Sequence, residues 1–191
     1  HTQEVEGLPS VHLSDGPHGL RKQEEKERQN NVSLVSTCYP TASALACSWD
    51  VTAAERLGRA VAKEAWNADV AVLLGPGINM KRSPLCGRNF EYFSEDPFLA
   101  GRLGAAYVSA AQGEDVAVSL KHFAANNQET NRQNANSQID ERALREIYLS
   151  AFEYVVKTAR PATIMASYNR LNGYYACENR HLLTEILREE W

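Results

Sequence analysis

Val116-Ala117-Val118-Ser119-Leu120 is an apolar run of strand length, and the polar pair Lys121-His122 follows it directly. A short run without a polar face is typical of a strand that is covered on both sides in a parallel sheet. We therefore predict that this run is a strand in the interior of the fold. Three similar runs, the last of them weaker, predict further strands of the same sheet: Val70 to Leu74, Ala162 to Ala166 and Val11 to Leu13.

Amphipathic segments separate these apolar runs. Asp50 to Trp66 places apolar residues at helical spacing, and Asp50 can cap the start of that helix. Asp96-Pro97 opens a second helix, because proline suits the first helical turn. The spacing predicts two more helices, from about Asp140 to Thr158 and from about Asn179 to Trp191. The alternation of strands and helices predicts an α/β fold built of right-handed crossover units.

About four such units are present, whereas a closed (β/α)8 barrel needs eight. Four units alone would leave open sheet edges, so we expect residues 1–191 to form the N-terminal part of a larger barrel domain. In such a barrel the loops at the C-terminal ends of the strands build the active site. The sequence places polar or glycine-rich residues at those ends: Asp15-Gly16-Pro17, Gly75-Pro76-Gly77, Lys121-His122-Phe123 and Tyr168-Asn169-Arg170.

The composition is that of a soluble globular protein, with 43% hydrophobic and 23% charged residues among 191. The formal net charge is only −4 and both signs are interspersed, which argues against nucleic acid or an anionic membrane as a partner. No apolar run approaches the roughly 20 residues of a membrane-spanning helix. The charged stretch Glu24 to Arg28 is interpreted as solvated surface.

The cysteines are scattered and form no Cys-x-x-Cys pair, which argues against a structural zinc site and a dense disulfide framework. Free thiols in a reducing compartment are the simplest interpretation, so we expect a cytoplasmic location. Secretion stays open, because a signal peptide that has been removed leaves no trace. The cysteines are Cys38, Cys47, Cys86 and Cys177.

The segment Gly87 to Pro97 is dense in polar and aromatic residues and resembles the Gly-Arg-x-x-Glu-x-x-x-Glu-Asp-Pro stretch of family 3 glycoside hydrolases. Each further match is a modest signal, but the matches keep the right order over nearly the whole chain. The segments that fit the bacterial β-glucosidase pattern of this family are Ser14 to Arg21, Gly75 to Asn79, Lys121 to Glu129, Glu141 to Glu146 and Ser167 to Asn169.

The resemblance implies a site that binds one sugar ring. A pyranose ring presents hydroxyls around its rim, which carboxylates can accept from and cations can donate to. By resemblance, Asp15 accepts from the hydroxyls farthest from the scissile bond, while Arg88, Lys121 and His122 donate to the same rim. Taken alone, Asp15 could instead be a turn former and His122 a core histidine.

Three more residues are implied nearer the reacting carbon. Arg132 and Tyr168 would orient the nucleophile and the charge that develops there, and Met165 would line the pocket. Tyr168 alone could also cap the core with its hydroxyl in water. We assign Glu91 and Asp96 to ion pairing and helix capping rather than to catalysis, and His18 to a turn.

The pair Lys121-His122 carries a geometric prediction of its own. Consecutive residues of a regular strand point to opposite faces, so two neighbours can reach one pocket only where the pleat is broken. We therefore expect a bulge or a non-proline cis peptide around Lys121-His122-Phe123.

The resemblance places the catalytic residues outside this chain. The family's nucleophile is an aspartate in a Ser-Asp-Trp sequence, expected shortly after Trp191, and its acid/base glutamate belongs to a later domain. The whole enzyme would hydrolyse terminal, non-reducing β-D-glucosyl residues of a β-glucoside or oligosaccharide by a retaining mechanism, without metal or cofactor. Its other parts would be the rest of the barrel and a C-terminal α/β sandwich domain, and the isolated chain would be inactive.

Two alternatives stay open. Relatives in the family cleave β-xylosides or arabinosides, and sugar choice depends partly on residues outside this chain. The N-acetylglucosaminidase branch is disfavoured, because Lys121-His122-Phe123 is followed here by Ala124-Ala125 and not by Pro-Gly. A catalytically inactive carbohydrate-binding fragment is the alternative from another functional class.

Overall fold

The computed structural model describes residues 2–7, 9–23 and 32–191. The stretch Glu24 to Arg28, predicted to be solvated, lies outside the described residues.

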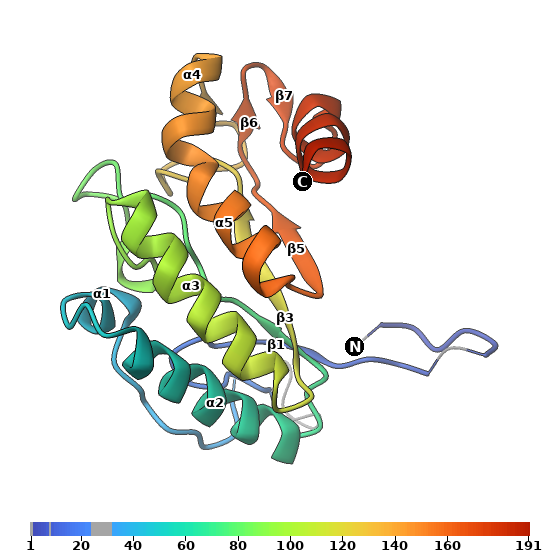
Figure 1. Ribbon diagram of the computed structural model, residues 1–191. Helices are drawn as coiled ribbons and strands as arrows, with labels where there is room; N and C mark the ends of the chain where they lie inside the picture. The colour runs from blue at the N-terminus through green and yellow to red at the C-terminus, as the bar shows by residue number, and fades with distance from the viewer. Residues whose placement is uncertain (1, 8, 24–31) are drawn as a thin grey trace.

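A parallel four-stranded sheet in the order β1-β2-β3-β5 forms the centre of the fold (Figure 1). All three strand pairs are parallel, as predicted from the apolar runs. The strands are β1 (Leu13–Asp15), β2 (Val72–Leu74), β3 (Ala117–Phe123) and β5 (Thr163–Ala166).

The first strand differs from its prediction, because it begins at Leu13 rather than at Val11. Both backbone groups of Val11 pair with Thr2 instead: Val11 N donates to Thr2 Oγ1 at 2.8 Å, and Thr2 N donates to Val11 O at 2.9 Å. The sheet strand therefore starts later and ends on Asp15, which lies beside Leu74 of β2.

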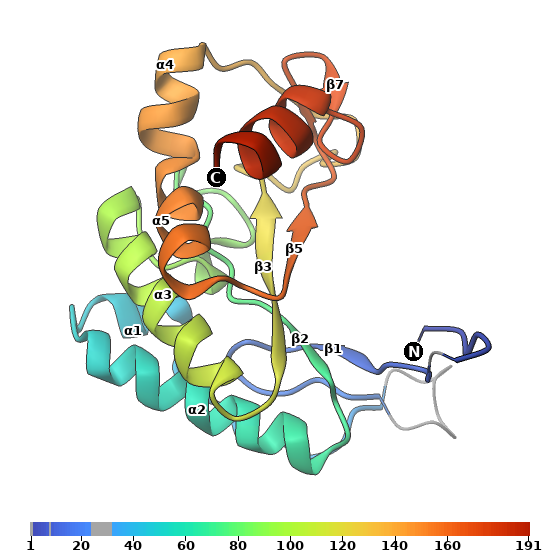
Figure 2. The ribbon, with the colours of Figure 1, turned by 45° about the vertical axis from the view of Figure 1, so that its right-hand side comes forward.

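Helices α2 (Val51–Asn67), α3 (Pro97–Gln112) and α5 (Ser150–Ala159) lie side by side against the sheet (Figures 1 and 2). The predicted caps are present, since Asp50 Oδ1 accepts from Thr52 N at 2.8 Å and Asp96 Oδ1 accepts from Phe98 N at 2.9 Å. A short helix, α1 (Ala42–Ala46), precedes α2 and was not predicted.

The helix layer is closely packed where α2 meets α3. A Cβ on Gly58 would lie 2.5 Å from the carbonyl oxygen of Tyr107, so only glycine allows this approach. Farther along the core, the ring of Phe123 in β3 packs edge-on against Phe152 of α5 and against Trp191. The apolar faces predicted for α2, α3 and α5 are therefore buried against the sheet and against one another.

The segment predicted as one helix from Asp140 to Thr158 comprises three successive pieces. These are α4 (Glu141–Ala143), the π-helical turn η3 (Leu144–Tyr148) and α5. The wider turn is visible in the bond from Leu149 N to Leu144 O at 2.8 Å, which spans five residues. The last predicted helix is η4 (His181–Glu190), also wound as a π-helix.

A second, three-stranded sheet in the order β4-β6-β7 was not predicted. Its strands are β4 (Asn136–Ser137), β6 (Arg170–Leu171) and β7 (Tyr174–Tyr175), too short to show an apolar pattern. The β6-β7 hairpin turns at Asn172-Gly173, both with positive φ, as the Asn-Gly dipeptide favours.

All four cysteines are free thiols, as expected, and Cys86 is buried. Within the described ranges, no helix is both long enough and apolar enough to cross a membrane.

Candidate active site

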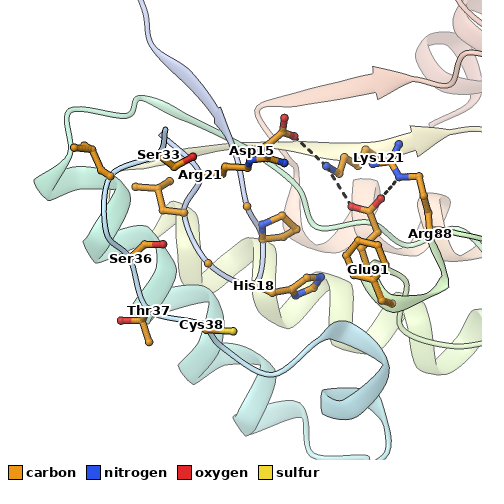
Figure 3. A pocket seen from close by; sticks show the side chains of 16 residues that line it. Asp15, His18, Arg21, Ser33, Ser36, Thr37, Cys38, Arg88, Glu91 and Lys121 are labelled. Atoms are coloured by element: carbon orange, nitrogen blue, oxygen red, sulfur yellow. Dashed lines mark hydrogen bonds and ion pairs between the residues drawn. The ribbon is translucent and has the colours of Figure 1, made fainter. Parts of the chain in front are cut away.

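A cleft of about 530 Å³ lies beside the end of β1 and the second half of β3. Asp15 from β1 and Lys121 from β3 line it, together with Glu91 from the 3-10 turn η2 (Asn89–Glu91) and Arg88, the residue before that turn. Figure 3 shows that these four side chains converge, although they come from three separate parts of the chain.

The turn after β1 holds Asp15 at the edge of the cleft. Gly16 has a φ of +114°, and a Cβ there would lie 2.0 Å from the carbonyl oxygen of Gly19. The turn is closed by Arg21 N, which donates to Asp15 O at 2.9 Å. Glycine at position 16 is therefore required for the shape of this turn, while the Asp15 side chain stays 63% exposed.

The buried ammonium of Lys121 lies between two carboxylates. Its Nζ is 3.4 Å from Asp15 Oδ1 and 3.5 Å from Glu91 Oε2, and the Lys121 side chain is only 3% exposed. Arg88 forms a second ion pair with Glu91. Pairing offsets the high cost of burying these charges. The ion-pairing role predicted for Glu91 is confirmed, and Asp15 is the carboxylate of the cluster that remains open to the cleft.

The break in the strand predicted at Lys121-His122 is also confirmed. The Lys121-His122 peptide bond is cis, and the pairing of β3 with β5 shifts register between Lys121 and Phe123. Asn79 binds this segment on both sides: His122 N donates to Asn79 Oδ1 at 2.7 Å, and Asn79 Nδ2 donates to His122 O at 2.8 Å. The segment after β2 thus holds the end of β3 in place.

His122 is deeply buried and is not among the residues that line the cleft described above. Its Nδ1 lies 2.9 Å from the hydroxyl oxygen of Tyr92. Burial, followed by the nearby charges of Arg88, Lys121 and Arg132, lowers the pKa of His122 to about 2. The ring is therefore neutral at any pH near neutrality.

Arg132 and Tyr168 are brought together beyond the end of β3. The guanidinium of Arg132 lies 4.5 Å above the Tyr168 ring, a cation–π contact, and its Nη1 donates to Glu129 Oε2 at 2.9 Å. Met165 of β5 is in register with Lys121 of β3. Arg132, Tyr168 and Met165 are not among the residues that line the cleft. Arg132 follows β3 in the chain, Met165 lies in β5, and Tyr168 follows β5.

The family model described as the glycosyl hydrolase family 3 N terminal domain matches residues 17–191. The chain belongs to this family. Among its family 3 relatives, the thermostable β-glucosidase B of Acetivibrio thermocellus is 54% identical over 195 residues, covering all of this chain and 26% of that protein. The exo-α-(1→6)-L-arabinopyranosidase of Bifidobacterium longum is 51% identical over 196 residues, with the same coverage.

Solved family 3 structures have the same fold. The β-glucosidase 3B of Thermotoga neapolitana in complex with glucose matches with a TM-score of 0.93 at 45% identity, over all of this chain and 27% of that one. The chain therefore spans about a quarter of the length of these relatives.

Several features around the family 3 site were missed from the sequence. His18 lies in the turn after β1, as predicted, but it also lines the cleft, with its ring centroid 6.5 Å from that of Phe90. Burial lowers the pKa of His18 to about 4, against the opposing effect of Glu91. Four residues that hold the site by hydrogen bonds had no predicted role: Asn79, Tyr92, Asn126 and Glu129. The bonds Asn79–His122, Tyr92–His122 and Asn126–Tyr92 join residues that are distant in sequence, so no local pattern reveals them.

In the part of the chain that the structure describes, no group of three or more His, Cys, Asp or Glu side chains is placed to hold a metal ion.

Proposed function

We propose that the enzyme to which this family 3 chain belongs hydrolyses terminal, non-reducing β-D-glucosyl residues, and that this chain supplies most of the glucose-binding subsite. The observation that carries the proposal is the convergence of Asp15, Arg88 and Lys121 on one cleft. Similarity to family 3 β-glucosidases, one of them solved with glucose, supports the same conclusion.

The charges of the cleft suit a neutral polyol. The exposed Asp15 carboxylate can accept from two adjacent hydroxyls, while the N–H groups of Arg88 and Lys121 donate to hydroxyl oxygens. Hydrogen bonds of this kind to charged groups are worth about 1.5–3 kcal/mol each. Glu91 pairs with Arg88, and both Glu91 and Asp15 pair with Lys121. The two cations are therefore already neutralised, so the cleft does not favour a phosphorylated sugar.

The proposed mechanism is retaining hydrolysis by two carboxyl groups about 5–5.5 Å apart. The nucleophilic aspartate would follow Trp191 in the chain, and the acid/base glutamate would come from a later domain. The rest of a (β/α)8 barrel would close against the β1 and β5 edges of the sheet. In this chain, the Arg132 guanidinium over Tyr168 is suited to orient the nucleophile and Met165 to line the sugar site.

A second candidate is arabinopyranosidase activity, favoured by the 51% identity to the Bifidobacterium longum enzyme. β-D-Glucopyranose and α-L-arabinopyranose differ in the orientation of the C4 hydroxyl and in the hydroxymethyl group that only glucose carries. The sugar of a β-xyloside differs from β-D-glucopyranose only in lacking that hydroxymethyl group. Asp15 and the two cations suit any of these rims, so residues outside this chain would decide among them.

The test is hydrolysis of aryl β-D-glucoside, aryl β-D-xyloside and aryl α-L-arabinopyranoside by the intact enzyme and its Asp15→Asn variant. We expect the glucoside to have the highest kcat/KM, and Asp15→Asn to lower it about 100-fold or more, since more than one charge-assisted bond is weakened. Asp69→Asn is the matched control: Asp69 is exposed in the turn before β2, at the opposite end of the strands, and its φ of +53° suits asparagine.

Preference for the arabinopyranoside would replace the main proposal by the second candidate. No turnover of any of the three substrates, with glucose binding retained, would support an inactive carbohydrate-binding protein. Equal activity of the Asp15→Asn and Asp69→Asn variants would remove Asp15 from the site.

A further inference from the structure

A buried chain of hydrogen bonds connects Asn126, Tyr92 and His122. Asn126 Nδ2 lies 2.8 Å from Tyr92 Oη, which lies 2.9 Å from His122 Nδ1. All three residues are 1% exposed, so solvent does not compete for these groups. In such a network, closed off from water, the chemistry of the side chains decides which group donates and which accepts in each hydrogen bond.

The direction follows from the acceptor at one end. The same Asn126 Nδ2 also lies 3.1 Å from Glu129 Oε1, and a carboxylate only accepts. The Asn126 atom that faces Glu129 must therefore be the amide nitrogen and not the amide oxygen. This nitrogen donates one hydrogen to Glu129 and the other to Tyr92. Because the Tyr92 oxygen accepts from the amide, its own hydrogen is available to His122 Nδ1.

We propose that Asn126 and Tyr92 are positioning residues that hold His122 in the tautomer protonated at Nε2, so that its Nε2–H is the hydrogen-bond donor to the sugar. This proposal rests on the proposed function for its last step only. The tautomer itself follows from the buried bonds. A neutral imidazole has one donor and one acceptor, and with Nδ1 occupied as acceptor the donor is Nε2.

The same amide reaches a second site residue. Glu129 accepts from Asn126 through Oε1 and from Arg132 Nη1 through Oε2, and Arg132 lies over Tyr168. Asn126 thus connects the residue that would donate to the sugar rim with the residue that would lie near the reacting carbon. One amide sets both orientations, which explains why an asparagine, with two donor hydrogens on one nitrogen, stands here.

Neutron diffraction from deuterium-exchanged crystals of the intact enzyme tests the tautomer directly. We expect deuterium on His122 Nε2 and not on Nδ1. In the nearly isosteric Asn126→Asp variant, a carboxylate would accept from the Tyr92 hydroxyl, whose oxygen would then accept from His122, so we expect deuterium on Nδ1. Deuterium on Nδ1 in the unmodified enzyme, or an unchanged position in the variant, would overturn the assignment.

Kinetics test whether the two residues act through His122. We expect Tyr92→Phe and Asn126→Asp to lower kcat/KM about tenfold, and Tyr92→Phe to have about no effect in a His122→Ala background. An equal loss in both backgrounds would mean a merely structural role and would contradict the proposal.

The matched controls make the same chemical changes elsewhere: Tyr154→Phe on α5, whose ring faces Arg102, and Asn134→Asp on an exposed turn. Both should keep the activity of the unmodified enzyme. An enzyme that hydrolyses none of the glycosides but shows deuterium on Nε2 would refute the proposed function and leave the tautomer standing.

Discussion

Lys121 is the residue on which the charge balance of the cleft depends. Its ammonium is buried and lies within 3.5 Å of one oxygen of Glu91 and 3.4 Å of one oxygen of Asp15. Glu91 keeps Arg88 as a second partner, whereas Asp15 has no second ion pair among the described residues. The side chain therefore both neutralises the cluster and offers a donor to a bound hydroxyl.

Replacing Lys121 by methionine keeps an unbranched side chain, shorter by one atom, and removes the ammonium charge. We expect kcat/KM of the intact enzyme to fall about 100-fold or more, because a charge-assisted bond is lost and the carboxylates repel each other. Lys157→Met is the control, since Lys157 pairs with Glu153 on the exposed side of α5. Similar activity of the two variants would show that Lys121 does not contact the substrate.

Asn79 holds the backbone of His122 through both atoms of its amide, and it is 2% exposed. A carboxylate at this position could still accept from His122 N but would repel His122 O. We expect Asn79→Asp to lower the free energy of unfolding by about 1–3 kcal/mol, the cost of leaving a buried group unsatisfied, and more than Asn134→Asp. Equal denaturant midpoints of the two variants would contradict this role of Asn79.

At the scale of elements, the sequence predicted what depends on local patterns. The apolar runs around Val72 and Val118 predicted parallel strands, and Asp50 and Asp96 predicted helix starts. It did not predict the second sheet, whose two-residue strands carry no period, or the π-helical turn at Leu144–Tyr148. Asp15 and Lys121 could be found because they follow apolar runs in the sequence, whereas Tyr92 acts through a partner 30 positions away and leaves no local signal.

The helix η4 is attached to the start of α4 by a pH-sensitive contact. His181 Nε2 lies 3.1 Å from Glu141 Oε2, and His181 Nδ1 lies 2.8 Å from Glu185 Oε2. The hydrogen bond with Glu185, opposed by burial and reinforced by Glu141, raises the pKa of His181. Arg145 adds ion pairs to Glu141 and to Glu190 of η4.

A raised pKa in the folded state means that protonation of His181 stabilises the contact. The stabilisation is complete below the ordinary histidine pKa of about 6.5 and is lost as the pH rises through the higher folded value. We expect backbone hydrogen exchange in η4, corrected for its intrinsic pH dependence, to be slower at acid than at alkaline pH, modestly because the groups are exposed. His181→Gln should remove that difference; a difference that survives the substitution would mean that another group controls it.

At the scale of the whole molecule, the chain makes up about a quarter of the length of its relatives. Among the described residues that line its cleft, the carboxylates are Asp15 and Glu91, but Glu91 is 6% exposed and paired with both Arg88 and Lys121. Such a group is a poor nucleophile, because its charge is already neutralised. On the proposed function, the described residues of this cleft are therefore expected to bind the sugar, and the retaining pair of carboxyl groups is expected to come from outside residues 1–191.

The isolated chain is accordingly expected to be inactive. The purified 191-residue chain, assayed on an aryl β-D-glucoside beside the intact enzyme, should show no turnover above the buffer blank. Hydrolysis that persists after repeated purification and disappears in Asp15→Asn would show that a complete catalytic pair lies within these residues.

We propose that Asp15, Arg88, Lys121 and His122 bind one sugar ring, and a crystal structure of the intact enzyme with glucose is the decisive experiment. We expect one ring whose hydroxyls contact the Asp15 carboxylate, the Arg88 and Lys121 cations and His122 Nε2. Glucose bound at another place, with these four side chains left in the contacts they make with one another and with Glu91 and Tyr92, would contradict it.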